Sequence, residues 1–242
     1  MSGESTKRVF VTTSWDDGHV CDRELAKLLE QHGLPGTFYI AQGNVELPHH
    51  ERLCDREIAD LACRFEIGGH TLTHRRLTSL PDDVARREIV DGKDVLEQVI
   101  GAPLHSFCYP GGQYRPRHTA MVRDAGFATA RTVRRGVTDF SPRYESHTTV
   151  HAYRHLVDGP AAIRLARGNF RRAAGVYCNW DVLATTMFDR VLHTGGVFHL
   201  WGHSWEIERN RDWGRLKRVF DYIGGRSDVN YIDNRALAAV AR

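Results

Sequence analysis

The sequence lacks the segments that mark secreted, membrane-spanning and nucleic-acid-binding proteins. Its polar start, MSGESTKR, contains no apolar signal region, and no later run approaches the ~18 apolar residues that suggest a membrane span. We therefore expect a cytoplasmic protein without an integral membrane segment. The 33 basic and 30 acidic residues nearly cancel, and the basic clusters RTVRR and RNFRR are separated, which argues against a nucleic-acid partner.

Cysteine is also scarce and poorly spaced for a structural role. The five cysteines include no CxxC pair, so they favour reduced thiols over a disulfide framework or a thiolate zinc site. In contrast, 14 histidines are present, and His70 and His74 lie close together in the sequence. The hydrophobic content of 41% suits a well-buried globular core in a chain of 242 residues.

Apolar, β-rich runs alternate with helical patterns along most of the chain. The alternation predicts a parallel α/β sheet that closes, or nearly closes, into a (β/α) barrel, with an open doubly wound sheet as the alternative. No repeat or linker divides residues 1–242, so we expect one domain. Strands are predicted at 8–15, 36–41, 65–71, 104–112, 128–133, 197–203 and 229–233. Helices are predicted at 22–33, 55–64, 81–101 and 213–225. A further helix is predicted to end at about residue 126, and two helical stretches are predicted to end near residue 196.

Polar residues follow several of the predicted strands. The segments are DDGH at 16–19, HTLTH at 70–74, CYPGGQY at 108–114, ARTVRR at 130–135 and HLWGHSWEIE at 199–208. Because the carboxyl ends of barrel strands meet on one rim, we expect these segments to converge there. This rim is the candidate site.

His70 and His74 have the spacing of two ligands to one metal ion. A helical turn with a pitch of ~5.4 Å would bring both imidazoles to the same side. Catalytic zinc commonly takes three protein ligands and keeps an open position, and either Asp16 or Asp17 would complete such a set. The other carboxylate would then accept a proton from water at the metal. Asp, Gly and His are also ordinary turn formers, so DDG by itself indicates no more than a turn.

Together these segments resemble the polysaccharide deacetylases of the NodB-homology type, carbohydrate esterase family four. SWDDG is similar to the family's first motif, HTLTH to its His-x-x-x-His motif, and TFYIA to its second strand. The resemblance extends from residue 8 to near residue 208. It implies a distorted, possibly incomplete (β/α) barrel and the metal-dependent hydrolysis of an N-acetyl group on an amino-sugar carbohydrate.

The resemblance also implies roles for particular residues. Asp16 resembles the family's catalytic base, while Asp17, His70 and His74 resemble its metal ligands, with zinc or a similar divalent ion expected. The tetrahedral oxyanion would need a further donor, for which a backbone N–H of the YPGG turn near Gly111 is the candidate.

Two positions depart from the family pattern. Many members have an arginine before the proline-containing third motif, where this chain has Cys108, and a thiol cannot replace a guanidinium. Arg131 either reaches the catalytic carboxylate from the next strand or is a surface residue. The late histidine motif offers His199 and His203, and we favour His203 as the general acid because it lies at the rim, with His199 in the core. The aspartate and tryptophan of the fourth motif have no evident counterpart.

Three residues near these motifs are candidates for substrate binding. Tyr114 and Trp205 could stack on sugar rings and His19 could contact the substrate, although ordinary packing or a turn also explains each of them. Trp201 is expected in the core.

The predicted function is the removal of acetyl from an N-acetylated carbohydrate or sugar derivative. A formyl group or another non-peptide amide is the alternative within the same chemistry. A non-catalytic carbohydrate-binding homologue is the alternative from a different functional class, and the missing motif arginine is the feature that supports it. The cytoplasmic expectation favours an intracellular sugar intermediate over chitin or peptidoglycan.

Overall fold

A computed structural model describes residues 7–155 and 179–240 of the chain. Within these residues, one parallel sheet of eight strands has the order β5-β4-β3-β2-β1-β7-β6, and β8 pairs with β1. The strands are β1 (Val9–Asp17), β2 (Thr37–Ile40), β3 (Glu66–Gly69), β4 (Ser106–Cys108), β5 (Thr129–Arg131), β6 (Val150–His151), β7 (Gly196–Gly202) and β8 (Asn230–Tyr231).

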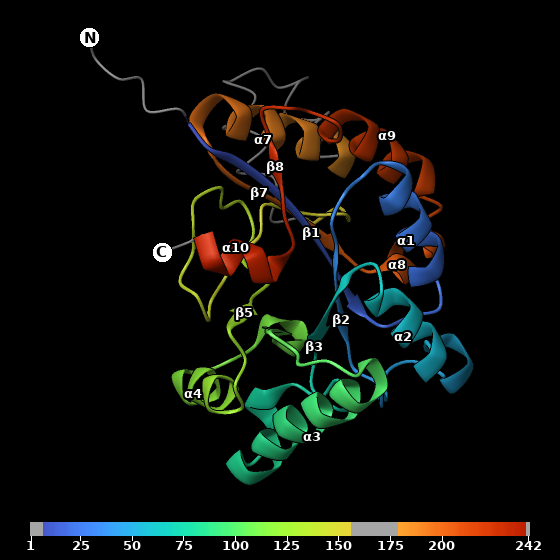
Figure 1. Cartoon of the computed structure of the whole chain (residues 1–242), viewed down its shortest axis with the longest axis vertical. Helices are drawn as coiled ribbons and strands as arrows, with labels where there is room; N and C mark the ends of the chain where they lie inside the picture. The colour runs from blue at the N-terminus through green and yellow to red at the C-terminus, as the bar shows by residue number, and fades with distance from the viewer. Residues whose placement is uncertain (1–6, 156–178, 241–242) are drawn as a thin grey trace.

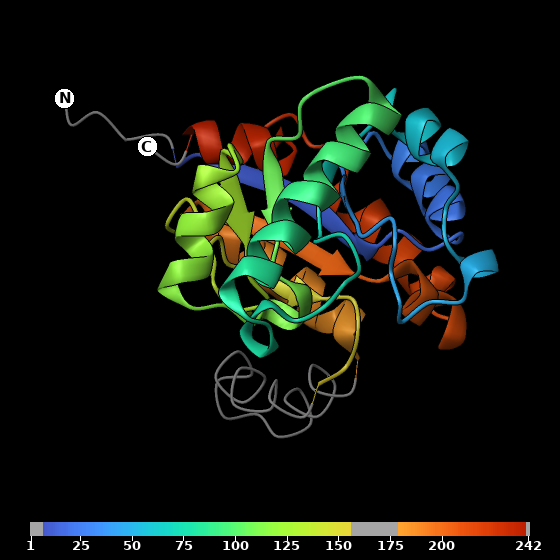
Figure 2. The ribbon, with the colours of Figure 1, turned by 90° about the horizontal axis from the view of Figure 1, so that it is seen from below.

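The helices surround the outside of this curled sheet. Figure 1 shows α7, α9, α1, α2, α3 and α4 following one another around it, and Figure 2 shows the strands in the middle with α3 on the near side. Their bounds are α1 (Asp22–Gln31), α2 (Asp55–Ala62), α3 (Asp82–Ile100), α4 (Pro116–Asp124), α7 (Trp180–Thr194), α8 (Ser204–Arg209), α9 (Trp213–Ile223) and α10 (Asn234–Val240). Short 3-10 turns lie at η1 (His49–Glu51), η2 (Leu77–Ser79) and η3 (Pro110–Gly112).

The sheet order ends at β5 on one side and β6 on the other. The prediction of a distorted, incomplete (β/α) barrel is therefore confirmed. Helix α10 has no counterpart among the predicted helices. Of the two helical stretches predicted to end near residue 196, the part before residue 179 lies outside the described residues.

β1 is a central strand, and its two faces have different surroundings. Trp15 lies on the outer face and packs edge-on against Phe220 of α9, with ring centroids 6.3 Å apart. On the inner face, Thr12 Oγ1 donates to Asn234 Oδ1 of α10 at 2.9 Å. The β pleat separates these two sets of side chains, so the helices cover an apolar face while the interior of the curl is polar.

The two edges of β1 are paired to different extents. One edge pairs with β7 over Val9–Trp15. The other edge is shared, because Ser14–Asp17 pair with β2 whereas Phe10 and Val11 pair with β8. A strand from near the start of the chain is therefore completed by two strands from near its end.

Helix α10 lies at the amino end of the curl. The backbone N–H of Asn234 donates to Thr37 Oγ1 and that of Arg235 donates to Glu66 Oε2, both at 3.1 Å. Since Thr37 and Glu66 are the first residues of β2 and β3, α10 covers this end of the sheet. The carboxyl ends of the strands lie at the opposite end.

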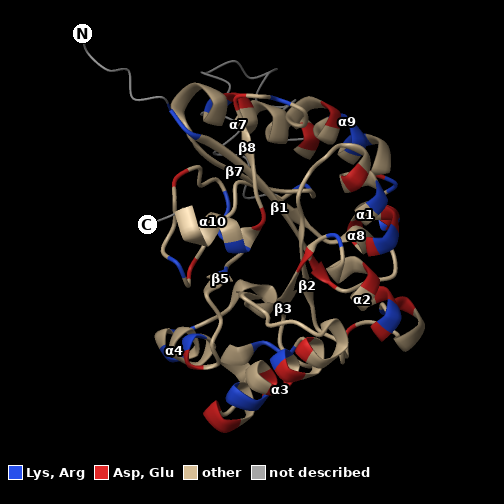
Figure 3. Ribbon diagram, in the orientation of Figure 1, with Lys and Arg blue, Asp and Glu red and all other residues tan. Residues whose placement is uncertain are grey.

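Acidic and basic residues are interspersed on the outer helices, and the strands carry few of them, as Figure 3 shows. Among the described residues, no helix combines the length and the apolar character needed to cross a membrane.

Candidate active site

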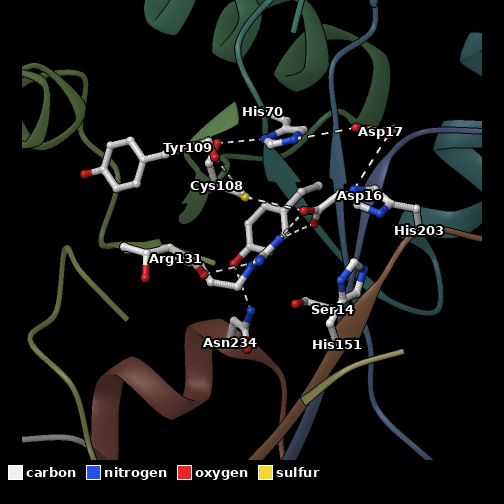
Figure 4. Close-up of polar contacts among 12 residues, drawn as sticks. Ser14, Asp16, Asp17, His70, Cys108, Tyr109, Arg131, His151, His203 and Asn234 are labelled. Carbon is white, nitrogen blue, oxygen red and sulfur yellow. Dashed lines mark hydrogen bonds and ion pairs between the residues drawn. The ribbon is translucent and has the colours of Figure 1, made fainter. Parts of the chain in front are cut away.

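Polar side chains from five strand ends come together at the carboxyl end of the sheet. Figure 4 shows side chains from β1, β4, β5 and the segments after β3 and β7 pointing toward one another around Asp16. The convergence that the sequence predicts for this rim is thus present in the fold.

Asp16 is the buried carboxylate at the centre of this group. It is 2% exposed, and Arg131 Nη2 donates to both of its carboxylate oxygens. Burial raises the pKa of Asp16, but the charge and hydrogen bond of Arg131, together with the charges of His70 and His203, lower the pKa to about 2. Asp16 is therefore ionised at neutral pH and able to accept a proton.

Arg131 reaches Asp16 from the strand next to Cys108. In the pairing of β4 with β5, Cys108 and Arg131 are register partners, so the guanidinium starts from the same level of the sheet as the thiol. Cys108 Sγ itself lies 3.7 Å from Asp16 Oδ2. Arg131 is 1% exposed and hence is not the surface residue of the alternative interpretation.

Asp17, His70 and His74 form a group that could hold one metal ion. Their ligand atoms all lie within 4.8 Å of one another. Asp17 Oδ1 is 3.7 Å from His70 Nε2 and 3.2 Å from His74 Nε2. Asp17 Oδ1 is also buried without a hydrogen-bond partner among the described residues, which fits an atom that binds a cation.

The contact of His70 with Cys108 orients the lone pair of His70 toward Asp17. His70 Nδ1 lies 2.7 Å from the carbonyl oxygen of Cys108, which can only accept, so Nδ1 carries the proton and Nε2 the lone pair. Burial lowers the pKa of His70 to about 4, which keeps the ring neutral. His74 Nδ1 lies 3.1 Å from Glu46 Oε2, without the geometry of a hydrogen bond. One carboxylate and two imidazoles suit a divalent ion such as zinc.

The backbone of this group is held in an uncommon conformation. Among the described non-glycine residues, φ is positive at Asp17 (86°), Thr71 (65°), His74 (64°) and Arg211 (57°). Each such residue costs of order 1–3 kcal/mol, and such costs cluster at functional sites. The prediction of a helical turn over His70–His74 is wrong, because the segment is irregular, yet its two imidazole centroids lie 4.8 Å apart.

A second group, Asp16, His70 and Cys108, also places its ligand atoms within 4.8 Å of one another. It does not fit a cation, because Arg131 already occupies both oxygens of Asp16. In addition, burial raises the pKa of the Cys108 thiol well above its usual range, so the thiol keeps its proton and is a poor ligand.

His203 follows β7 and faces Asp17 from the other side of the site. Its Nε2 lies 3.9 Å from Asp17 Oδ2, and its Nδ1 lies 2.7 Å from Glu206 Oε2. Burial lowers the pKa of His203, but the hydrogen bond to Glu206 and the charges of Asp17 and Asp16 raise it to about 9. His203 is thus protonated at neutral pH and able to give up a proton at Nε2.

His199 and Trp201, which precede His203 on β7, both lie in the core. His199 is 1% exposed and its Nε2 lies 2.8 Å from Ser14 Oγ, while burial lowers its pKa to about 3. Trp201 stacks on His151 of β6, with ring centroids 3.9 Å apart and an interplanar angle of 11°. Neither residue faces Asp17 as His203 does.

The YPGG turn offers one free amide. Tyr109 N–H donates to Arg131 O at 3.2 Å, and Gly112 N–H donates to Tyr109 O at 2.8 Å. Gly111 N–H has no backbone partner among the described residues and Gly111 is exposed, so its role as an oxyanion donor stays a prediction. The φ of 61° at Gly111 and of 67° at Gly112 explain why glycine occupies both positions.

Trp205 contacts the candidate metal ligand directly. Its indole Nε1 donates to Asp17 Oδ2 at 2.8 Å, and its ring lies beside that of His203 with centroids 5.3 Å apart. The guanidinium of Arg209 lies 4.7 Å from the ring centroid. Trp205 therefore helps to orient Asp17, and its role in sugar stacking stays a prediction.

The other two predicted substrate contacts have internal partners. Tyr114 stacks on Tyr109 with centroids 4.6 Å apart, and its hydroxyl donates to Glu145 Oε2 at 2.8 Å. His19 is buried, and its Nδ1 accepts the N–H of Cys21 at 3.1 Å. Packing and turn formation explain these contacts, and substrate binding by both residues stays a prediction.

A sequence profile of the family described as polysaccharide deacetylase matches residues 3–130, more than half of the chain. The chain belongs to the polysaccharide deacetylase family. The resemblance found in the motifs is thereby confirmed. The matched span contains Asp16, Asp17, His70 and His74, whereas Arg131 and His203 lie beyond it. No curated protein sequence matches the chain.

Solved structures share the fold at low sequence identity. A candidate polysaccharide deacetylase from Mycobacterium smegmatis matches with a TM-score of 0.63 and 17% identity, over 100% of this chain and 93% of its own. A CE4 family pseudoenzyme from Bacillus anthracis matches with a TM-score of 0.57 and 15% identity, over 96% of this chain and 66% of its own. A mutant of that pseudoenzyme has restored enzymatic activity.

The deacetylase PplD of Streptococcus pyogenes, solved in complex with acetate, matches over a smaller part. Its TM-score is 0.53 at 17% identity, over 56% of this chain and 62% of its own. The match thus spans less than two thirds of that protein. Likeness at these identities shows the fold, and the chemistry has to be argued from the residues of this chain.

Three contact residues were missed by sequence reasoning. Glu46 and Glu206 touch His74 and His203, and His151 touches Glu206. The spacing of Glu206, three residues after His203 at the start of a helix, is a signal that could have found it. No local signal marks His151, because it comes from a strand about 50 residues away.

Proposed function

We propose that this chain is a metal-dependent N-deacetylase that acts on an N-acetylated amino-sugar carbohydrate, with residues 1–242 as one catalytic domain. The observation that carries the proposal is the position of Asp17. Its carboxylate faces His70 and His74 on one side and His203 on the other, directly after the ionised Asp16 in the chain. Family membership supports the same chemistry.

In this proposal Asp17, His70 and His74 hold the metal, for which zinc is the first candidate. A divalent cation in such a site lowers the pKa of water and polarises a carbonyl oxygen. Asp16 accepts the proton of the attacking water, and Arg131 keeps Asp16 ionised and fixed in place. Arg131 thus takes over the task of the arginine that Cys108 replaces.

His203 and Gly111 have the two remaining roles, protonation of the leaving amine and stabilisation of the oxyanion. An amine leaves a tetrahedral centre poorly unless its nitrogen is protonated, and His203 carries the proton for it at Nε2. The free N–H of Gly111 would stabilise the negative oxygen that develops in the transition state. Base and acid would then lie on opposite sides of the substrate.

The alternative of a non-catalytic carbohydrate-binding homologue has some support, since a pseudoenzyme shares the fold. The contact between Arg131 and Asp16 weakens it, because the missing motif arginine was its main argument. The choices between acetyl and formyl, and between an intracellular sugar derivative and an extracellular polymer, stay predictions.

Metal content and product release test the proposal together. Purified protein should contain one equivalent of divalent metal and release acetate from N-acetylated amino-sugar oligomers, with formate release measured in parallel. His74→Ala should lose both the metal and the activity, while the exposed His193→Ala should keep both. A full equivalent of metal in the His74 variant would show that the ligand set is wrong. Metal binding without release of any acyl group would support the non-catalytic alternative.

A further inference from the structure

Four side chains, including the proposed acid His203, form a cluster next to Asp17. They are His151 of β6, Trp201 of β7, and His203 and Glu206 at the start of α8, and we call them the acid-side cluster. His151 and Trp201 are register partners on neighbouring strands, which brings a residue from the irregular middle of the chain against the site. Figure 4 shows the imidazoles of His151 and His203 on the same side of Asp16.

One oxygen of Glu206 lies close to a ring nitrogen of both imidazoles, and the contact with His203 has the geometry of a hydrogen bond. His203 Nδ1 lies 2.7 Å and His151 Nε2 lies 3.0 Å from the same atom, Glu206 Oε2. The side chain of Glu206 is 11% exposed, so little water competes for that oxygen. The other oxygen, Oε1, lies 3.9 Å from Nη2 of Arg209, whose side chain is 57% exposed. Glu206 Oε2 is therefore close to two imidazoles, whereas Glu206 Oε1 has only the longer contact with Arg209.

His151 is itself fixed on three sides. Its ring stacks on Trp201, and its Nδ1 lies 2.5 Å from His155 Nε2. An ionised carboxylate can only accept, so the His151 proton belongs on Nε2, next to Glu206, and Nδ1 accepts from His155. The residue is 4% exposed, and burial lowers its pKa to about 3, in agreement with a neutral ring that has this single proton.

We propose that His151 is a positioning residue for the proposed acid His203 and acts through Glu206. By holding Glu206 Oε2 in place, the His151 ring fixes the carboxylate that binds His203 Nδ1, and so directs His203 Nε2 toward the substrate side of Asp17. The role of His203 as acid belongs to the proposed function, on which this inference rests. The contact between His151 and Glu206 can nevertheless be tested whether or not the enzyme assay succeeds.

Kinetics of a variant pair separate the polar contact from ring packing. His151→Phe keeps a flat ring for Trp201 and removes both nitrogens, whereas His151→Gln places an amide donor near the position of Nε2. We expect His151→Phe to lower kcat roughly tenfold with KM changed less than about twofold, a part of the roughly 10²–10⁴-fold contribution of general acid–base catalysis. His151→Gln should recover most of kcat. His193→Phe, an exposed histidine on α7, is the matched control and should be unaffected.

A double-mutant cycle tests whether His151 acts through Glu206. Glu206→Gln should lower kcat on its own, and adding His151→Phe to it should cause no further loss, since the oxygen that His151 holds is already altered. Independent, multiplicative losses would overturn the proposal. A rise in KM without a fall in kcat for His151→Phe would overturn it as well.

A measurement without turnover makes the inference independent of the enzyme assay. In protein labelled with ¹⁵N-histidine, the His203 Nδ1–H bonded to a carboxylate should give a far-downfield proton signal. That signal should be lost or broadened in His151→Phe and in Glu206→Gln, and retained in His193→Phe. An unchanged signal in a folded His151→Phe variant would overturn the proposal even if the protein deacetylates its substrate.

If no acyl group is released from any substrate but the signal changes as expected, the proposed function fails while the positioning contact stands. The acid-side cluster also places His151, His203 and Glu206 ligand atoms within 4.8 Å of one another. A second equivalent of zinc in the wild type that is absent from His151→Phe would therefore assign the cluster to metal binding and overturn the positioning role. If His151→Phe does not fold, His151→Met against His151→Gln gives the same comparison.

Discussion

Asp16 at the carboxyl end of the curled sheet and Glu66 at its amino end have pKa values shifted in opposite directions. Asp16 is the next-to-last residue of β1, and although burial acts against it, Arg131 lowers its pKa to about 2. Glu66 is the first residue of β3, and burial raises its pKa to about 7. Both residues are well supplied with hydrogen-bond donors, so the number of donors does not explain the difference.

The charge of the partner explains it. Thr37 and Ser106, the first residues of the neighbouring strands, each donate a hydroxyl to Glu66 at 2.7 Å, and these neutral dipoles do not offset the cost of removing a carboxylate from water. The negative charge of Asp233 raises the pKa of Glu66 further. Arg131 brings a full positive charge to Asp16. The carboxyl end of the sheet thus keeps an anion ready for proton transfer, whereas the amino end uses a carboxyl group to join β2, β3, β4 and α10.

The largest effect is expected when the carboxylate at the carboxyl end is neutralised. Asp16→Asn should lower deacetylation by roughly 10²–10⁴-fold, because the amide cannot take the proton of the attacking water. Metal content should be unchanged, and the rates are compared at a temperature where circular dichroism shows a folded variant, since Arg131 loses its counter-charge. Glu66→Gln, assayed beside it, should keep its activity. Loss of metal from Asp16→Asn would mean that the two adjacent aspartates have been assigned the wrong way round.

Removing the guanidinium of Arg131 should raise the pKa of Asp16, as burial raises the pKa of Glu66. Arg131→Met leaves a buried, unpaired carboxylate and should lower the free energy of unfolding at pH 7 by about 3–5 kcal/mol. The pKa of Asp16 should then rise above its ordinary value, so this loss should shrink as the pH falls and Asp16 takes up a proton. Urea unfolding at pH 7 and pH 5 measures both effects. A loss of the same size at the two pH values would contradict the explanation by partner charge.

Glu66 should give the opposite pH dependence from Asp16 in the wild type. Its pKa is about 7 in the folded protein against an ordinary value of 4.5, so the folded state binds the extra proton. The contribution of Glu66 to stability is therefore present below about pH 4.5 and lost as the pH rises to about 7, by at most ~3 kcal/mol. Thermal unfolding from pH 4 to pH 8 should show this decline, and Glu66→Gln should flatten it. An equally steep decline in the variant would assign it to another group.

The smallest effect is expected for a substitution of His199, which lies on β7 between the amino and carboxyl ends of the sheet. Its register partner on β1 is Thr12, and its Nε2 lies 2.8 Å from Ser14 Oγ. His199→Gln keeps an amide near Ser14 and should cost about 1 kcal/mol of stability with less than a twofold change in kcat. His203→Gln, made in parallel, should lose activity with little change in unfolding. The reverse result for the pair would exchange the assignments of acid and core histidine.

Much of the fold could be predicted because its signals are local. Periodic apolar residues and a terminal glycine predict the long helix closed at Gly101, which indeed has a φ of 67°. β6 and α10 were missed for a physical reason. A strand of two residues has no measurable periodicity, and α10 has only seven residues, so neighbouring elements determine both.

The site residues that could be predicted are those that lie at or directly after the carboxyl ends of strands. Asp16, Asp17 and the two histidines of HTLTH lie in loops that the fold must bring together. The contact of Arg131 with Asp16 depends on the register of β4 against β5, which neither segment encodes alone. The positive φ of Asp17 and His74 is likewise imposed by the surrounding structure, so a helical turn was the natural but wrong prediction for the histidine pair.

The shared edge of β1 also affects how the chain is made. Val9 pairs with Gly196 and Phe10 with Asn230, so β1 is synthesised more than 180 residues before these partners. At ~5–20 residues per second, that delay lasts roughly 10–40 s. During this time one edge of β1 and the start of the other are unpaired, and such an edge is a template for strands of other chains. The nascent polypeptide therefore has a long interval in which this unpaired edge can associate with strands of other chains.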